Sequence, residues 1–451
     1  MNAVAAAIPL PLRLAPAEAE IRLGRSLASN NPRHNWALYL FVLLVPLQNI
    51  YSQYIPNVGG GLNFLNVMFA ASLVMALHAG GRLVRGTGVN GWAFAFMAGS
   101  GIALLVGFNT VTHPENHVSA LKDQLIGMSF LFLAQMSATD WGGIRRLLLV
   151  SLLPLPYMFH VVRDQHSSVA SWHYDHALRV AGTFSGLGAN EFAAFCVTAT
   201  LFCAALLLTV RLRAGWRAVL LLAVAFAGTG VVLTYSRTAY IAVLVGFVLL
   251  LLLRRARARL LIVAVAALLL VPPLLPNSVV QRFESIELEE NARDESTASR
   301  FVFWRIAIDR FADDPVLGTG YHTFHHEEVN PFRMDTHNFF LRELVEKGVL
   351  GMIILVGLLY SIGRMLWRGY RGAVVGSWSY GLCLALFCAY AAFLCGNLFG
   401  DRFTHYPMAA HFWLYVGLAL RCVALQREQR RRAVEAVRAP SAPSTQEVAR
   451  A

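Results

Sequence analysis

Long apolar stretches separated by short polar ones recur along the whole chain. About twelve of them approach the ~20 residues that a helix needs to cross the hydrocarbon core of a bilayer. The 451 residues are 57% hydrophobic and only 14% charged, and their mean hydropathy of +0.53 lies outside the usual soluble range. The sequence therefore predicts an all-α polytopic membrane protein with about twelve transmembrane helices.

The predicted spans, some of them short or interrupted by proline, lie at residues 36–51, 62–79, 92–108, 118–136, 147–159, 191–210, 218–235, 239–253, 260–275, 344–362, 380–399 and 411–425. In domain terms we expect a cytoplasmic N-terminal segment (1–35), nine transmembrane helices (36–275), a large periplasmic loop (276–336), three further transmembrane helices (337–425) and a disordered basic cytoplasmic tail (426–451).

Arginines gather in the connections that follow every second span. They occupy 80–86, 144–146, 211–217, 254–259, 364–371 and 427–432. This distribution is the positive-inside pattern, which predicts that both termini are cytoplasmic. The net charge of +12 is thereby explained by topology, and nucleic-acid binding is not expected. The six cysteines all lie inside apolar spans without metal-ligand spacing, so we expect packing residues and no disulfide framework.

The 276–336 connection is the only sizeable polar stretch on the opposite, outward side. Its later half has an amphipathic helical pattern formed by Phe301, Trp304, Ile308 and Phe311, which ends at Pro315. A glycine-rich turn with Gly318 and Gly320 follows that helix.

"DTHNFFLRELVEKGVLG", residues 335–351, places His337 and Asn338 where this outward loop ends and an apolar helix begins. Asp335 or Thr336 is predicted to cap the helix, which puts His337 in its first turn. The helix dipole there disfavours imidazolium, and a neutral imidazole is the form that a general base requires. The alternative is an interfacial histidine that only hydrogen-bonds a loop.

Basic residues on the outward side are unusual for a membrane protein and indicate an anionic ligand. We predict that a phosphate group is bound by a set drawn from Arg237, Arg300, Arg179, Arg402 and Lys122, with Arg305 nearby. The competing interpretation is local ion pairing, with Arg402 bound to Asp401, Arg305 to Asp309 and Lys122 to Asp123.

Histidines cluster in "GYHTFHHEE", at positions 322, 325 and 326, and in "WHYDH", at 173 and 176. A zinc site needs three or four convergent ligands, and neither stretch has a recognisable ligand spacing. We therefore expect surface histidines and no metal site, with metal binding as the alternative.

Three pieces of the chain resemble the bacterial O-antigen ligases and their relatives, the O-antigen polymerases and protein O-oligosaccharyltransferases. The similar pieces are "TYSRTAY", "SRFVFWRIAIDRFADDPVLGTGYHTF" and "THNFFLRELVEKGVLG", in that order along residues 179–420. The resemblance implies a GT-C-like glycosyltransferase of the bacterial inner membrane whose active site is periplasmic. The implied donor is O-antigen on undecaprenyl pyrophosphate, the implied acceptor is lipid A–core, and membrane lipids surround both.

In such an enzyme a sugar hydroxyl attacks the anomeric carbon and the pyrophosphate departs, with inversion and without a metal or other cofactor. The resemblance makes His337 the general base and the arginines the pyrophosphate ligands, with Arg237 and Arg300 foremost. Asn338 would shape the start of the helix. Aromatic residues, either lining the sugar path or anchoring the interface, are Trp304, Tyr321, Phe324, Phe339 and Tyr406.

Two other functions remain open from the sequence. A polymerase or a protein O-oligosaccharyltransferase would share the chemistry and differ only in the acceptor. A transporter of the same lipid-linked glycan would place charges near the bilayer midplane. We expect spans nearly free of charge apart from Lys122 and Asp123, which favours an enzyme.

Overall fold

The computed structural model describes residues 34–54, 63–112, 114, 116–167, 178–184, 186–253 and 295–438. These residues form α-helices joined by turns and loops, with no strand among them, as predicted. The helices are α2 (Trp36–Leu44), α3 (Gln48–Tyr54), α4 (Phe64–His78), α5 (Val89–Thr110), α6 (His117–Ser137), α7 (Trp141–Leu152), α8 (Leu155–Ser167), α9 (Ala189–Thr209), α10 (Ala214–Leu233), α11 (Arg237–Leu253), α14 (Glu295–Asp313), α15 (Phe339–Gly372), α16 (Trp378–Asn397) and α17 (Tyr406–Arg438).

Within the described residues, seven helical segments are long and apolar enough to cross a membrane, and they are α5, α7 with α8, α9, α10, α15, α16 and α17. The shorter α4 and α11 are also apolar, and the predicted span at 260–275 lies outside the described residues. The first predicted span is broken at Pro46 into α2 and α3, because proline has no N–H to donate within a helix. The helix α17 continues to Arg438, into the tail that was predicted to be disordered.

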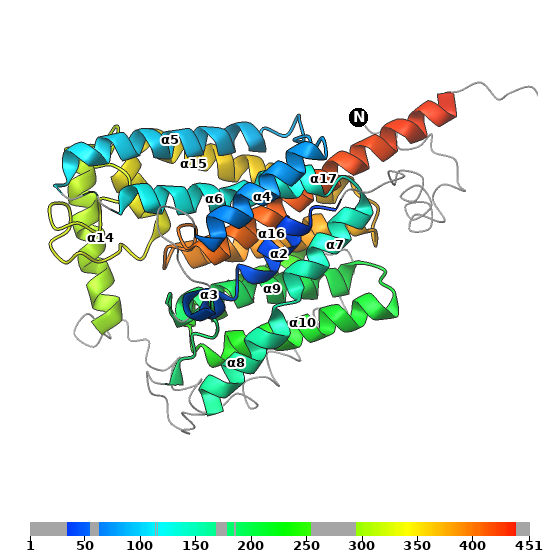
Figure 1. Cartoon of the computed structure of the whole chain (residues 1–451), viewed down its shortest axis with the longest axis horizontal. Helices are drawn as coiled ribbons and strands as arrows, with labels where there is room; N and C mark the ends of the chain where they lie inside the picture. The colour runs from blue at the N-terminus through cyan, green and yellow to red at the C-terminus, as the bar shows by residue number, and fades with distance from the viewer. Residues whose placement is uncertain are drawn as a thin grey trace, which may run out of the picture.

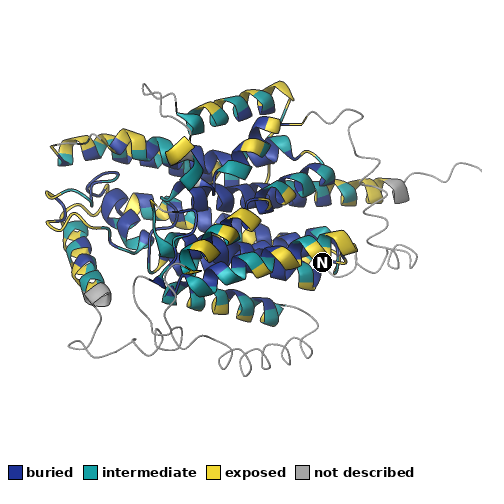
Figure 2. Cartoon of the chain, turned by 60° about the horizontal axis from the view of Figure 1, so that its bottom comes forward, coloured by how far each residue is buried: buried dark blue, intermediate teal, exposed yellow. Residues whose placement is uncertain are grey.

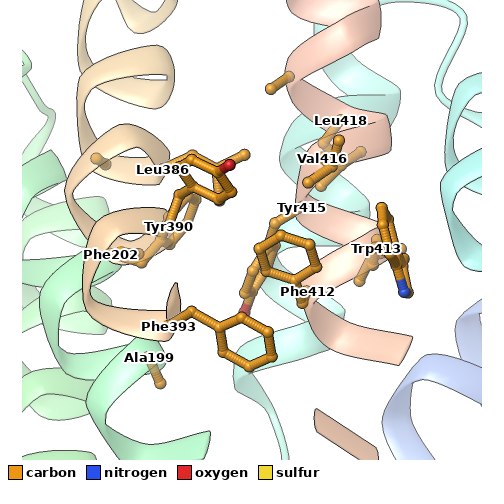
Figure 3. Close-up of a cluster of buried hydrophobic side chains, with 14 of the residues drawn as sticks. Ala199, Phe202, Leu386, Tyr390, Phe393, Phe412, Trp413, Tyr415, Val416 and Leu418 are labelled. Atoms are coloured by element: carbon orange, nitrogen blue, oxygen red, sulfur yellow. The ribbon is translucent and has the colours of Figure 1, made fainter. Parts of the chain in front are cut away.

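The three helices α9, α16 and α17 form the centre of the molecule and are the most buried of the candidate spans (Figures 1 and 2). Aromatic rings interlock between them, as Figure 3 shows. The Phe393 ring stacks on Phe412 at 4.6 Å, and the Phe202 ring stacks on Tyr415 at the same distance. Five of the cysteines are buried and Cys395 is half-buried; all six are free thiols.

Outer helices expose apolar side chains instead of polar ones. Phe94, Ile102 and Leu105 of α5 are each at least half exposed (Figure 2). In water such a surface would be an aggregation hazard, whereas in a bilayer it contacts lipid tails. This exposure fits the polytopic membrane protein that the sequence predicts.

The basic connections 80–86, 144–146, 211–217, 364–371 and 427–432 lie toward one end of the bundle, on the right in Figure 1, and the connection 254–259 lies outside the described residues. The Arg211 N–H donates to the Gly376 carbonyl at 3.0 Å, and the Arg421 side chain donates to the Gln135 carbonyl. The opposite end carries α14 and the start of α15, where the Phe339 N–H donates to the Gly400 carbonyl at 3.1 Å. The fold thus separates the basic loops from the loops that carry the candidate site residues.

Candidate functional site

The glycine-rich turn after α14 is built into a break in α15. The backbone of α15 leaves helical geometry at Gly348, where φ is +61°. The turn fills the gap: the Thr319 N–H donates to the Val345 carbonyl, and the Val349 N–H donates to the Pro315 carbonyl, both at 2.9 Å. The carbonyl and N–H groups that the break releases are therefore satisfied by the turn.

Only glycine fits two positions of this turn, Gly318 and Gly320, which have φ of +72° and +107°. A Cβ on Gly320 would lie 2.2 Å from the Cα of Gly107 in α5, and one on Gly318 would lie 2.6 Å from the backbone of Glu346 in α15. The backbone of this glycine-rich turn therefore lies tightly between α5 and α15, and we call residues 315–321 the glycine-rich wedge. Tyr321, predicted as a supporting residue, is buried in this wedge, where its N–H donates to the Ala103 carbonyl.

His337 precedes α15 instead of lying in its first turn. Asn338 is the N-cap, and its side-chain oxygen accepts from the N–H groups of Phe340 and Leu341 at 3.1 and 3.2 Å. The prediction that Asp335 or Thr336 caps the helix is therefore wrong, whereas a helix-shaping contact of Asn338 is present. His337 has a φ of +52°, a strained conformation for a residue with a side chain.

Trp304 fixes the loop that leads to His337. Its indole N–H donates to the Thr336 carbonyl at 2.9 Å. The face of α14 that packs against the protein is formed by Phe303 and Ala307, while Phe301 and Ile308 of the predicted apolar face are exposed. The predicted apolar face of α14 was therefore partly wrong. Compared with the prediction, the helix is rotated about its axis so that Phe303 points inward. The centroids of the Phe303 and His337 rings are 6.3 Å apart.

The pKa of His337 is lowered, first by burial and then by the positive charges of Arg300 and Arg402, while Asp335 and Glu191 act in the opposite direction. A neutral imidazole is favoured, as the sequence analysis expects, but the cause is different. Burial and two arginines supply the effect that had been attributed to the helix dipole.

Arg402 is buried and forms an ion pair with Glu191 of α9, not with Asp401 as the local-pairing interpretation assumed. Its Nε has no hydrogen-bond partner among the described residues. A narrow cleft adjoins it between α9, α11 and α16, and is lined by Asn190, Ala194, Val197, Thr198, Ser236, Thr238, Ala239, Ala242, Ala392, Phe393, Gly396 and Arg402. The cleft is polar near Arg402 and apolar farther along the helices.

Arg179 lies at the polar part of this cleft. Its guanidinium donates to the Asn190 side chain at 2.5 Å and to the Thr234 carbonyl at 3.2 Å, and the Ser236 hydroxyl donates to the same Asn190 oxygen. Arg237 follows Ser236 directly and begins α11. Arg402 therefore lines the cleft and Arg179 contacts its lining residue Asn190, whereas Arg237 lies between the lining residues Ser236 and Thr238 without lining the cleft itself. The charges of Arg300 and Arg402 act on His337.

Lys122 is not brought to this group by any contact among the described residues. It lies on α6 and forms an ion pair with Asp123 at 3.3 Å, with both side chains partly exposed. The local-pairing interpretation is correct for this residue. Arg305 is exposed on the outer face of α14.

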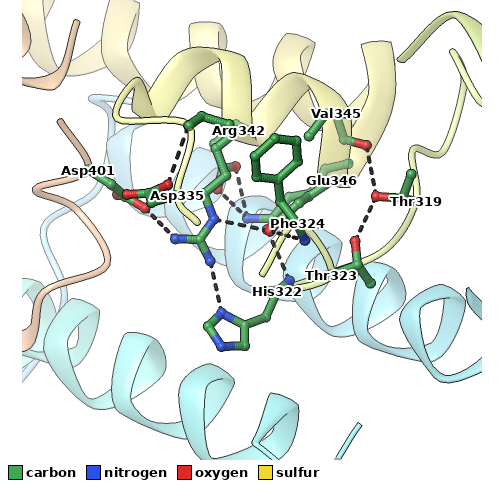
Figure 4. Close-up of polar contacts among 12 residues, drawn as sticks. Thr319, His322, Thr323, Phe324, Asp335, Arg342, Val345, Glu346 and Asp401 are labelled. Carbon is green, nitrogen blue, oxygen red and sulfur yellow. Dashed lines mark hydrogen bonds and ion pairs between the residues drawn. The ribbon is translucent and has the colours of Figure 1, made fainter. Parts of the chain in front are cut away.

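Four charged residues of α15 were missed by the sequence analysis. Arg342, Glu343, Glu346 and Lys347 are each at most 4% exposed and form two i,i+4 ion pairs, one of which is drawn in Figure 4. The expectation that the spans are nearly free of charge apart from Lys122 and Asp123 is therefore wrong for α15. Opposite charges four residues apart inside an apolar stretch are the signal that could have revealed them.

The histidines of the 322–326 segment are not surface residues. His322 and His325 are half-buried, and burial together with the charge of Arg342 lowers the pKa of each to about 3. His326 contacts His117 of α6, with 2.9 Å between their Nε2 atoms. No group of three or more potential ligands is placed to hold a metal in the described part of the chain, and the 173–176 histidines lie outside it.

Comparison with known protein families gives a match over part of the chain. Residues 222–356 match the family model described as O-antigen ligase. This segment is similar to the O-antigen ligases. The resemblance drawn from the sequence is thereby confirmed, and a search of curated proteins found no matching relative.

The O-antigen ligase segment runs from α10 into α15. It contains Arg237, Arg300 and His337 together with the glycine-rich wedge. Arg179 and Arg402 lie outside the segment and join it through the contacts described above. The family supports a glycosyltransferase-type enzyme that acts on a lipid-linked glycan and an acceptor.

Proposed function

We propose that this protein is an O-antigen ligase that transfers a glycan from undecaprenyl pyrophosphate to a terminal sugar hydroxyl of lipid A–core. One observation carries the proposal. His337, whose pKa is lowered, lies within the electrostatic reach of Arg300 and Arg402, and Arg402 also lines a cleft that is polar at one end and apolar along its helices. This reaction needs a proton acceptor, cations that stabilise the leaving pyrophosphate, and an apolar surface for the lipid chain.

In the proposed step, the acceptor oxygen forms a bond to the anomeric carbon of the donor sugar while the bond from that carbon to the pyrophosphate oxygen breaks. His337 takes the proton of the acceptor hydroxyl. The negative charge that develops on the pyrophosphate is neutralised by Arg402, Arg300, Arg237 and Arg179, of which Arg402 has an unused donor at Nε. Direct displacement by a hydroxyl inverts the configuration at the anomeric carbon.

The positive charge of Arg402 is expected to be needed for glycan transfer. Arg402→Gln removes the charge and should lower kcat/KM for transfer by about 10²–10³, the cost of losing one electrostatic donor at a reacting centre. Steady-state transfer by purified protein with a lipid-pyrophosphate glycan and lipid A–core measures the effect. Lys122→Gln is the matched control, because the partly exposed Lys122 pairs with Asp123 and has no described contact with Arg402 or His337, and it should stay within about twofold. Equal losses in both variants would contradict the proposed anion site.

The end of the bundle that carries the site is proposed to face the periplasm, because the arginine-rich connections lie at the other end. An exposed cysteine at each end tests this. Asp314→Cys should react with a membrane-impermeant maleimide in intact spheroplasts, whereas Gly215→Cys should react only after lysis. The reverse pattern would place the site in the cytoplasm and rule out a periplasmic ligase.

A further inference from the structure

The Arg342 side chain joins three segments that are distant in the sequence. Its Nε donates to Glu346 of α15 at 3.1 Å, its Nη1 forms an ion pair with Asp401, and its Nη2 lies 2.9 Å from Nδ1 of His322 (Figure 4). Glu346 in turn accepts from the backbone N–H groups of His322 and Phe324. All three guanidinium nitrogens are used, so the geometry of this side chain is fully determined.

The loop that Arg342 holds is the one that carries Arg402. Asp401 directly precedes Arg402, and the preceding Gly400 carbonyl accepts from the Phe339 N–H at the start of α15. The Arg402 N–H donates to the Asn397 side chain at 2.9 Å. The backbone is therefore anchored on both sides of Asp401, and this backbone fixes the base of the Arg402 side chain, whose guanidinium end pairs with Glu191.

We propose that Arg342 is a positioning residue that acts through Asp401 to hold the Arg402 guanidinium where its charge acts on His337. The inference rests on the proposed function, which gives Arg402 its role in transfer. Buried ion pairs stabilise a fold little more than well-packed apolar residues would. A three-way contact at 4% exposure is better explained by the geometry it imposes than by stability.

The position of Arg402 can be followed through the pKa of His337, because the charges around the imidazole set that pKa. Arg300 of α14, Glu191 of α9, Asp335 of its own loop and Arg402 act on its pKa, and Arg402 lowers it. Loss of the negative charge of Asp401 would by itself lower the pKa of His337, whereas displacement of the positive charge of Arg402 would raise it. A raised pKa of His337 after a substitution at Asp401 therefore reports a displaced Arg402.

The experiment is the pH titration of His337 in the purified full-length protein. Diethyl pyrocarbonate reacts with neutral imidazole, so peptide-resolved modification rates give the titration without any enzymatic assay. Asp401→Asn should raise the apparent pKa of His337 by about 0.5–1 unit, and Arg402→Gln should raise it likewise. The double variant should match Arg402→Gln alone, because both act through one guanidinium. Arg342→Lys, which keeps the charge but loses the three-way contact, should shift the pKa in the same direction.

The control is the second buried ion pair of α15. Lys347 contacts Glu343 at 2.8 Å and the Ser100 hydroxyl at 2.9 Å, and has no described contact with the 400–402 loop. Glu343→Gln should destabilise the protein without shifting the titration of His337. A wild-type titration in both Asp401→Asn and Arg342→Lys, or an equal shift in Glu343→Gln, would overturn the inference. Failure of the proposed function would instead appear as absent glycan transfer by the wild-type protein, whatever the titration shows.

Discussion

His337→Ala is expected to lower kcat for glycan transfer by about 10²–10⁴, the range typical for the loss of a general base. Burial and the charges of Arg300 and Arg402 keep this imidazole neutral and able to accept a proton. Because its pKa lies below the ordinary 6.5, wild-type activity should persist at pH 6.5 and fall only as the pH drops through the lowered pKa. The measurement is a pH profile of initial transfer rates.

A histidine at the other end of the bundle controls for nonspecific effects. His78 is exposed in the last turn of α4, and His78→Ala should transfer at the wild-type rate. If His337→Ala also retains wild-type transfer, His337 is only an interfacial residue whose strained backbone shapes the start of α15. The general-base assignment would then be wrong.

Gly320→Ala is expected to destabilise the folded protein by about 3 kcal/mol or more. A Cβ at this position would lie 2.2 Å from the Gly107 Cα, and the φ of +107° is unfavourable for any other residue. The wedge would have to leave the break in α15, which exposes the backbone groups around Gly348. Thermal unfolding in detergent, followed by loss of the monodisperse peak in size-exclusion chromatography, measures this effect.

Gly101→Ala is the matched control in α5. Nothing lies within 4 Å of its added Cβ, so the change should be neutral or slightly stabilising, since alanine favours the helix by about 0.5–1 kcal/mol. Equal melting temperatures for Gly320→Ala and the wild type would contradict the close approach between the turn and α5.

Hydropathy was sufficient to predict most of the helices, because crossing a bilayer demands long apolar segments and leaves a strong pattern. It could not resolve the break at Pro46, nor the break at Gly348, because the wedge that satisfies the second one lies some thirty residues earlier in the chain. The rotation of α14 was also missed, since the periodicity of its apolar residues fits two neighbouring faces.

The sequence predicted which types of residue form the candidate site, but not which of those residues pair with one another. Arginines on the outward side are costly, and the sequence reveals them for that reason. Arg402 pairs with Glu191 and Arg342 pairs with Asp401, each more than fifty residues away in the sequence, so no local pattern could identify these two pairs. The sequence suggested an ion pair between Arg402 and its neighbour Asp401, but in the structure Asp401 forms its ion pair with Arg342.

The most direct test of the ligase proposal is an analysis of products. Purified wild-type protein would be incubated with undecaprenyl-pyrophosphate-linked glycan and lipid A–core, and every lipid species would be identified by mass spectrometry. The account predicts lipid A–core extended by one donor glycan, joined by an inverted linkage, together with free undecaprenyl pyrophosphate. Longer lipid-linked glycans with unmodified lipid A–core would indicate a polymerase, and would contradict the proposed acceptor.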